Sequence, residues 1–158
     1  MLKIVLFQPE IAGNVGAIIR CCACFDAEFH VIEPLGFPFD LQRIKRSAMD
    51  YIESVKIYRH PSFEIFFEEN ILKNKNRLIL ASTKGRQDVQ EFKFKENDFI
   101  LFGKESAGVP DFIHSKADHK VLIKMKNNQR SLNLAISCGI FLSKASFDIS
   151  DAKSNFEI

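Results

Sequence analysis

The stretch Phe99-Ile100-Leu101-Phe102-Gly103-Lys104-Glu105-Ser106-Ala107-Gly108-Val109-Pro110 decides the fold. Its first four residues, 99–102, form a short apolar run of the kind that is buried as a strand of a parallel sheet. Two glycines, Gly103 and Gly108, follow on either side of a carboxylate, and Pro110 begins a new segment. Glycine allows a ligand to approach the backbone closely, or supplies a positive φ. In open α/β sheets ligands bind just after such strands, at their carboxyl ends.

The rest of the chain alternates apolar runs with helical patterns. We expect strands at residues 2–7, 29–32, 54–58, 77–82, 99–102 and 120–123, and helices at 14–26, 40–49, from Pro61 onward and at 131–145. This alternation predicts an α/β fold, a mainly parallel sheet flanked by helices. The chain has 158 residues, about the size of one domain, so we expect residues 1–146 to form a single domain and the polar residues 147–158 to be a frayed tail.

The composition indicates a folded, soluble protein. Hydrophobic residues make up 46% of the chain and charged residues 27%, which excludes a disordered or fibrous chain. No apolar run approaches the roughly 20 residues that cross a bilayer, and no secretory signal is recognisable, so we expect a cytoplasmic protein with no membrane partner. The 22 Lys and Arg residues against 20 Asp and Glu residues give a net charge of +2. Any contact with nucleic acid must therefore come from a local basic patch.

The four cysteines form neither a disulfide framework nor a convincing metal site. Three of them cluster in Cys21-Cys22-Ala23-Cys24, and Cys138 stands alone. Cys21 and Cys24 formally make a C-x-x-C pair, but a structural zinc site needs two more ligands, and a redox motif of this kind opens a helix after a strand. The cluster instead falls inside an apolar-periodic helix. We interpret these cysteines as small hydrophobes on a buried face.

Neither common nucleotide-binding fingerprint is present. A P-loop that ends at Gly103-Lys104 would need glycine at position 98 and Ser or Thr at position 105, where the chain has Asp98 and Glu105. The pattern G-x-G-x-x-G does not occur either. A flavodoxin-like nucleotide or flavin module stays open as an alternative, because it is the default for a small α/β chain with glycine loops.

Two further loops at strand ends carry polar residues that suit a ligand. After the first strand, Asn14 is placed to cap the following helix, and Arg20 lies about 9 Å further along the helix axis. The basic, amide-rich loop 124–134 leads into the last helix, with Ser131 in the capping position and Asn133 in the first turn. Capping alone explains these residues, although helix N-termini also bind phosphate and carboxylate groups.

Taken together and in order, three motifs resemble the ribose 2'-O-methylating branch of the SPOUT family of RNA methyltransferases. The motifs are N-x-x-x-x-x-R from Asn14 to Arg20, G-x-E-x-x-G-x-P from Gly103 to Pro110, and R-S-L-N-L from Arg130 to Leu134. The short length, Pro9-Glu10 and the segment from Val31 to Phe37 are similar to the minimal, single-domain members of the family. The resemblance covers about residues 1–146.

The resemblance implies a fold, an activity and partners. The fold would be the single-domain SPOUT fold, with a C-terminal trefoil knot that holds S-adenosylmethionine, and the protein would be a homodimer with its site near the subunit interface. The activity would be S-adenosylmethionine-dependent 2'-O-methylation of the wobble nucleotide of tRNA, a cytidine, with uridine left open as a further acceptor. The nucleic-acid partner would be tRNA and not DNA. Because the methyl donor carries its own leaving group, no metal is required. A non-catalytic RNA-binding protein of the same fold is a further alternative.

The resemblance also assigns site residues. Its functional positions match Asn14, Arg20, Glu105, Ser131 and Asn133, and its contacts to the methyl donor match Ala81, Gly103, Ile123 and Ser131. We interpret Arg20 as a phosphate clamp that orients the ribose and stabilises the developing alkoxide, because a neutral guanidine is too costly to serve as the base. The candidates for RNA binding are basic residues of local clusters, namely Arg43, Lys45, Arg46, Arg59, Lys124, Lys126 and Arg130.

Overall fold

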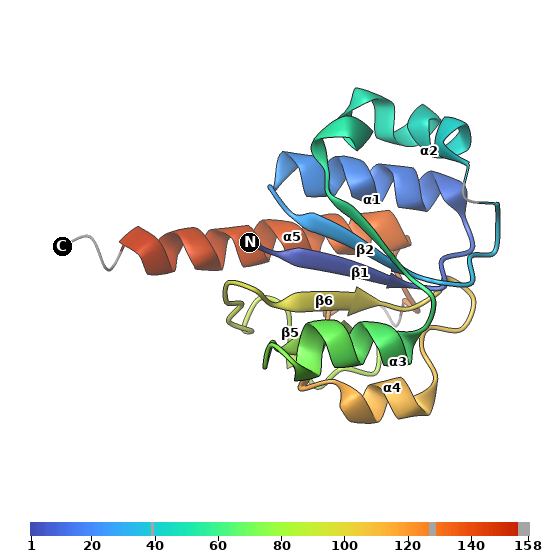
Figure 1. Ribbon diagram of the computed structural model, residues 1–158. Coiled ribbons are helices and arrows are strands. Elements are labelled where there is room, and N and C mark those ends of the chain that lie inside the picture. The colour runs from blue at the N-terminus through green and yellow to red at the C-terminus, as the bar shows by residue number, and fades with distance from the viewer. Residues whose placement is uncertain (39, 127–128, 155–158) are drawn as a thin grey trace.

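The chain forms one layer of strands between two layers of helices, as the computed structural model in Figure 1 shows for residues 1–38, 40–126 and 129–154. The strands are β1 (Lys3–Phe7), β2 (Glu28–Ile32), β3 (Ile57–His60), β4 (Leu78–Ala81), β5 (Gln87–Asp88), β6 (Phe99–Phe102) and β7 (His119–Leu122). They lie in the order β3-β2-β1-β6-β4-β7-β5, and neighbouring strands pair in parallel. The expected α/β class and parallel sheet are confirmed.

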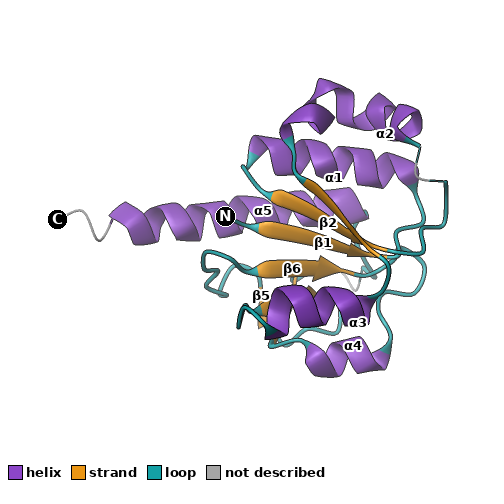
Figure 2. Cartoon of the chain, in the orientation of Figure 1, coloured by secondary structure: helices purple, strands orange, loops and turns teal. Residues whose placement is uncertain are grey.

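Helices cover both faces of the sheet (Figure 2). They are α1 (Ala12–Cys24), α2 (Leu41–Ala48), the 3₁₀ segment η1 (Met49–Ser54), α3 (Phe63–Phe66), the π-helical segment η2 (Phe67–Leu72), α4 (Asp111–Lys116) and α5 (Leu134–Ser154). α1 and α5 lie on one face, with α2 packed outside α1, and α3 and α4 lie on the other (Figure 1). Within the described part of the chain, no helix is long and apolar enough to cross a membrane.

Each face of the sheet has its own core, because successive side chains of a strand point to opposite faces. In β1, Ile4 and Leu6 pack toward α1 and α5, whereas Val5 and Phe7 pack toward α3 and α4. Strands that are buried on both faces read as continuous apolar runs, and this is why the short runs in the sequence predict their positions well. Cys22 and Cys138 are fully buried in the α1–α5 core.

The structure corrects two expectations about helix caps. α1 begins two residues before Asn14, so Asn14 lies in its first turn and does not cap it. α5 begins at Leu134, and its cap is Asn133 instead of Ser131. The Oδ1 atom of Asn133 accepts the backbone N–H groups of Ala135 at 2.9 Å and Ile136 at 3.3 Å. Both asparagines are therefore in contact with a helix N-terminus, in positions other than the expected ones.

The expected frayed tail is wrong as far as the structure describes it, because α5 continues to Ser154. Asp148 is buried in this part of the helix and accepts the backbone N–H of Phe94 at 3.1 Å. The Nζ atom of Lys144, one turn earlier, lies 2.6 Å from the same carboxylate. This buried pair attaches the last turns of α5 to the loop before β6, so their polar composition does not prevent helix formation. Residues 155–158 lie outside the described part.

Candidate functional site

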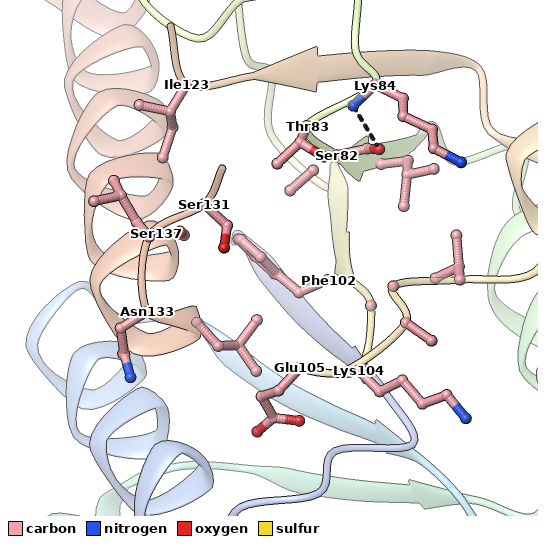
Figure 3. A pocket seen from close by; sticks show the side chains of 18 of the residues that line it. Ser82, Thr83, Lys84, Phe102, Lys104, Glu105, Ile123, Ser131, Asn133 and Ser137 are labelled. Atoms are coloured by element: carbon pink, nitrogen blue, oxygen red, sulfur yellow. Dashed lines mark hydrogen bonds between the residues drawn. The ribbon is translucent and has the colours of Figure 1, made fainter. Parts of the chain in front are cut away.

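A cavity of about 550 Å³ lies at the carboxyl ends of the central strands. β6, β4 and β7 are consecutive in the sheet, so the segments that follow them emerge side by side. Residues 82–84 and 103–109, Ile123 and Met125 of these segments line the cavity, together with the first turns of α1 and α5. Figure 3 shows Ser131 and Asn133 on the side of α5, and Glu105 beside Lys104 below them. This is the edge at which parallel α/β sheets bind their ligands.

The glycine loop after β6 forms a tight hairpin in the wall of this cavity. The backbone N–H of Lys104 donates to the carbonyl oxygen of Gly108 at 3.1 Å, and the N–H of Gly108 donates back at 2.9 Å. Gly108 has a φ of +65°, and a Cβ added at Gly103 would lie 2.5 Å from the Cα atom of Gly108. Both positions therefore require glycine, one for its positive φ and the other for the close approach of two backbones.

The carboxylate of Glu105 projects from this hairpin to the N-terminus of α1. Its Oε2 accepts the backbone N–H of Glu10 at 2.8 Å, and its Oε1 accepts the N–H of Ile11 at 3.2 Å and Nδ2 of Asn14 at 3.1 Å. A helix N-terminus carries unpaired N–H groups and a partial positive charge, which a carboxylate satisfies well. Glu105 therefore binds the two residues just before α1 and the side chain of Asn14 in its first turn.

The two asparagines connect this contact to the last helix. Nδ2 of Asn133 donates to Oδ1 of Asn14 at 3.1 Å, while Nδ2 of Asn14 donates to Glu105. Asn14 is 8% exposed, so both ends of its amide are held in a largely buried position. A continuous chain of hydrogen bonds therefore runs from the loop after β6, through α1, to the start of α5. Three motifs that are far apart in the sequence meet in one place.

The structure brings all but one of the expected site residues to the cavity. Ala81, Gly103 and Ile123 line it near the ends of their strands, and Ser131 lies in the segment that leads into α5. Arg20 lies elsewhere, on the exposed side of α1. Its guanidinium stands 5.4 Å from the ring centroid of Tyr51. Arg20 comes six residues after Asn14. Six residues of an α-helix rotate the side-chain direction by about 240°, so the two side chains point to different sides of α1.

The lining residues that sequence reasoning missed include Ser82, Thr83, Lys84 and His114. The first three follow β4 directly, and the rule that ligands bind at strand ends would have found them. The backbone N–H of Lys84 donates to Oγ of Ser82 at 3.2 Å and turns the chain there (Figure 3). The pKa of His114 is lowered by partial burial and by the charges of Lys84 and Lys120. This end of the cavity is therefore rich in cationic groups.

The expected RNA-binding cations are spread over the molecule. Arg130 lines the cavity, and Lys124 and Lys126 are exposed in the same loop. Arg59 is paired with Glu33, Nη2 to Oε1, at 2.5 Å. The remaining candidates belong to α2, where Arg46 is exposed and the side chains of Arg43 and Lys45 lie outside the described residues. Among described residues, no group of three or more His, Cys, Asp or Glu could hold a metal ion.

Comparison with known proteins identifies relatives of the whole domain. The chain is 41% identical over 140 residues to a tRNA (cytidine(34)-2'-O)-methyltransferase of Beijerinckia indica, with 89% of this chain and 87% of that protein covered. A solved structure concerned with 2'-OH methylation of C/U34 on tRNA matches with a TM-score of 0.90 and 35% identity, covering 96% of this chain and 97% of that chain.

A third relative was solved with a ligand. The SpoU methyltransferase AviRb of Streptomyces viridochromogenes, in complex with the cofactor AdoMet, matches with a TM-score of 0.85 and 25% identity, covering 93% of this chain and 57% of that chain. The model of the SpoU rRNA methylase family matches residues 1–143. The expected resemblance to SPOUT methyltransferases is thereby confirmed. The chain belongs to the SpoU rRNA methylase family.

Proposed function

We propose that the protein transfers a methyl group from S-adenosylmethionine to the ribose 2'-hydroxyl of the wobble nucleotide of tRNA, a cytidine or a uridine. One observation carries this proposal: the chain of hydrogen bonds from Glu105 through Asn14 to Asn133 joins all three motif loops at one cavity. The names of the relatives support it, since they combine AdoMet, 2'-O-methylation and position 34 of tRNA. A cytoplasmic location and a knotted C-terminal segment are parts of the same proposal.

The cavity suits a nucleoside-containing methyl donor. Its volume of about 550 Å³ lies within the usual range for small-molecule sites. Leu80, Phe102 and Ile123 supply apolar surface for a base, and the hairpin at Gly103 brings backbone groups close to it. Ala81, Gly103, Ile123 and Ser131 would hold the donor. Bound S-adenosylmethionine supplies an electrophilic methyl group on a sulfonium sulfur.

The residues of the chain would position the acceptor for an in-line displacement. The ribose 2'-oxygen forms a bond to the methyl carbon while the carbon–sulfur bond breaks and its electron pair stays on sulfur. Asn133 and Ser131 would orient the hydroxyl, because the amide nitrogen of Asn133 keeps one N–H beyond its bond to Asn14. The hydroxyl proton would pass to an RNA phosphate oxygen or to water, since arginine holds its proton at any working pH.

The proposal includes a homodimer, which the position of Arg20 supports. Arg20 lies on α1 away from the cavity of its own chain, so it would reach a cavity only as part of a second copy. Ile11, Leu132 and Ile136, beside the cavity, are 51%, 40% and 56% exposed, as expected for a surface that another chain covers. In the dimer, Arg20 would clamp an RNA phosphate and stabilise the developing alkoxide.

Mixed dimers test this arrangement. Chains that carry Arg20→Ala and chains that carry Asn133→Ala should each be inactive alone. After mixing and subunit exchange, one site of each mixed dimer would combine an intact cavity with an intact Arg20, so activity should return. If mixing restores nothing although mixed dimers are demonstrated, Arg20 does not act across the interface. A protein that is monomeric by light scattering would also contradict the dimer.

Incubation with tritium-labelled S-adenosylmethionine and total tRNA tests the activity itself. We expect label in tRNA from the unaltered protein and none with Asn133→Ala, which removes the polar link between α1 and α5. Phosphate contacts should make tRNA binding weaken as salt is raised. Donor binding without any transfer to RNA would favour the alternative of a non-catalytic RNA-binding protein of the same fold.

A further inference from the structure

Glu10 is a second carboxylate beside the cavity, in the loop that follows β1. Its Oε2 accepts the backbone N–H of Ser106 at 2.8 Å, and its Oε1 accepts the hydroxyl of Ser106, also at 2.8 Å. The backbone N–H of Glu10 in turn donates to the carboxylate of Glu105. The contact is therefore reciprocal. The carboxylate of Glu10 accepts a backbone N–H of the loop after β6, and the carboxylate of Glu105 accepts a backbone N–H of the loop after β1. We call the pair formed by Glu10 and Ser106 the loop clasp.

Ser106 lies at the tip of the hairpin that Lys104 and Gly108 close. Residues 103–109 of this hairpin line the cavity, so the position of the tip shapes the cavity wall. Backbone pairing fixes only the base of the hairpin. A short hairpin of this kind has little stability of its own, and its conformation depends on contacts made by its tip. The loop clasp supplies such a contact with two hydrogen bonds to a charged acceptor.

The backbone of Glu10 packs against a second loop. The backbone N–H of Gly36 donates to the carbonyl oxygen of Pro9 at 2.9 Å, and a Cβ added at Gly36 would lie only 2.9 Å from the Cα atom of Glu10. The loop after β2 therefore packs directly against Glu10. The hydrogen bonds from Ser106, first that of its backbone N–H, also keep the pKa of Glu10 below its ordinary value. The carboxylate of Glu10 is therefore charged and oriented by Ser106, while Gly36 packs against the Cα atom of the same residue.

We infer that Glu10 is a positioning residue for the methyl donor: through the loop clasp it holds residues 103–109 in the conformation that forms the wall of the donor cavity. The inference rests on the proposed function, because it concerns S-adenosylmethionine in that cavity. Glu10 acts through Ser106 and not by touching the donor. Its loss should therefore weaken donor binding and raise KM for the donor, while tRNA affinity and kcat at saturating donor stay close to those of the unaltered protein.

Calorimetric titration with S-adenosylmethionine tests this role in the full chain. Deletion of two hydrogen bonds to a charged group predicts that Glu10→Ala binds the donor about tenfold more weakly. Glu10→Gln keeps an oxygen for the N–H of Ser106 and an amide N–H for its hydroxyl oxygen, so its affinity should stay within about threefold. Glu91→Ala removes an exposed loop carboxylate far along the chain from the clasp and serves as the matched control, with unchanged affinity expected.

Hydrogen exchange of the ligand-free protein gives a second, independent readout. The amides of residues 104–108 should exchange faster in Glu10→Ala than in the unaltered protein, and no faster in Glu91→Ala. Ser106→Ala deletes only the hydroxyl bond and should weaken donor binding about threefold, which keeps the test available if Glu10→Ala does not fold.

The outcomes separate this inference from the proposed function. If the unaltered protein binds the donor and Glu10→Ala binds it equally well, the loop clasp has no positioning role, while the proposed function stands. If Glu10→Gln is as weak as Glu10→Ala, the hydrogen bonds to Ser106 are not the cause of the effect, and the inference is wrong. If the unaltered protein does not bind S-adenosylmethionine, the proposed function fails and the inference fails with it.

Discussion

Replacement of Glu105 by alanine should loosen the site more than any other single change in the hydrogen-bonded chain. Its carboxylate accepts three hydrogen bonds, from the backbone of Glu10 and Ile11 and from the amide of Asn14. The N–H of Ile11 is exposed and would form a hydrogen bond to water instead. The N–H of Glu10 and the amide of Asn14 are partly buried and would lose their acceptor. Each bond to a charged acceptor contributes about 1.5 kcal/mol in such a setting, so the expected loss of unfolding free energy is about 3 kcal/mol.

This loss is measurable by thermal and urea denaturation. For a domain of this size, about 3 kcal/mol corresponds to a fall in Tm of roughly 6–12 °C. Glu105→Gln keeps one acceptor oxygen and places an amide N–H among donors, so it should lie between alanine and the unaltered protein. Glu91→Ala should change Tm by less than about 1 °C. If the free energy of unfolding of Glu105→Ala lies within about 0.5 kcal/mol of that of the unaltered protein, this expectation is refuted, because the carboxylate of Glu105 then does not stabilise the fold.

Three further changes have definite expected results. Gly16→Ala should cost about 1–3 kcal/mol in urea denaturation, since its new Cβ would lie 2.5 Å from Cβ of Ser47 on α2; an unchanged midpoint would mean that α1 and α2 separate easily. The pKa of His30 is lowered from its ordinary 6.5 to about 3, first by burial of the imidazole and then by the charges of His60 and Lys3. Below pH 6.5 His30 therefore binds a proton in the unfolded chain but stays neutral in the folded chain. The free energy of unfolding should fall by about 1.5 kcal/mol between pH 6.5 and pH 5, and His30→Gln should remove most of this pH dependence. Arg20→Ala should abolish methyl transfer and leave donor affinity unchanged by calorimetry; a collapse of donor affinity would place Arg20 in the donor site.

The central strands β1, β2, β4 and β6 could be predicted from the sequence because they are buried on both faces, whereas the strand expected at 54–58 is β3 at Ile57–His60, whose middle residues are exposed. The run 99–102 has the bounds of β6, and the expected strands 77–82 and 120–123 differ from β4 and β7 by one residue at each end. β5 was missed because two residues, Gln87 and Asp88, carry no apolar pattern. α4 was missed because its six residues are mostly exposed and only Ile113 is buried. Short elements of this kind are defined by their neighbours and not by their own periodicity.

The site was predictable as a set of positions and not as a set of contacts. Asn14 and Asn133 were both interpreted from local capping rules, which cannot reveal that their amides bind each other across 119 positions of sequence. The same limit applies to Glu105, whose three donors all come from the segment after β1. Long-range polar pairs leave no periodic signal, because only the folded sheet brings β1 and β6 together.

The extent of the last helix also depended on tertiary contacts. Local composition marks residues 147–154 as polar and irregular, yet the buried carboxylate of Asp148, with Lys144 and the backbone of Phe94, keeps them helical. Arg20 is the converse case. The motif that contains it predicts a site residue, but within one chain the helix turns it away from the cavity. Its place in a functional site depends on the proposed homodimer, which the mixed-dimer experiment tests.

Locating the transferred methyl group tests the proposed activity most directly. Total tRNA lacking the modification should be incubated with the protein and S-adenosylmethionine, digested, and analysed by mass spectrometry of the nucleosides and of the anticodon fragments. We predict one added methyl group on the ribose of the wobble nucleotide, absent with Asn133→Ala. A methyl group on a base, or on a ribose at any other position, would contradict the proposed activity.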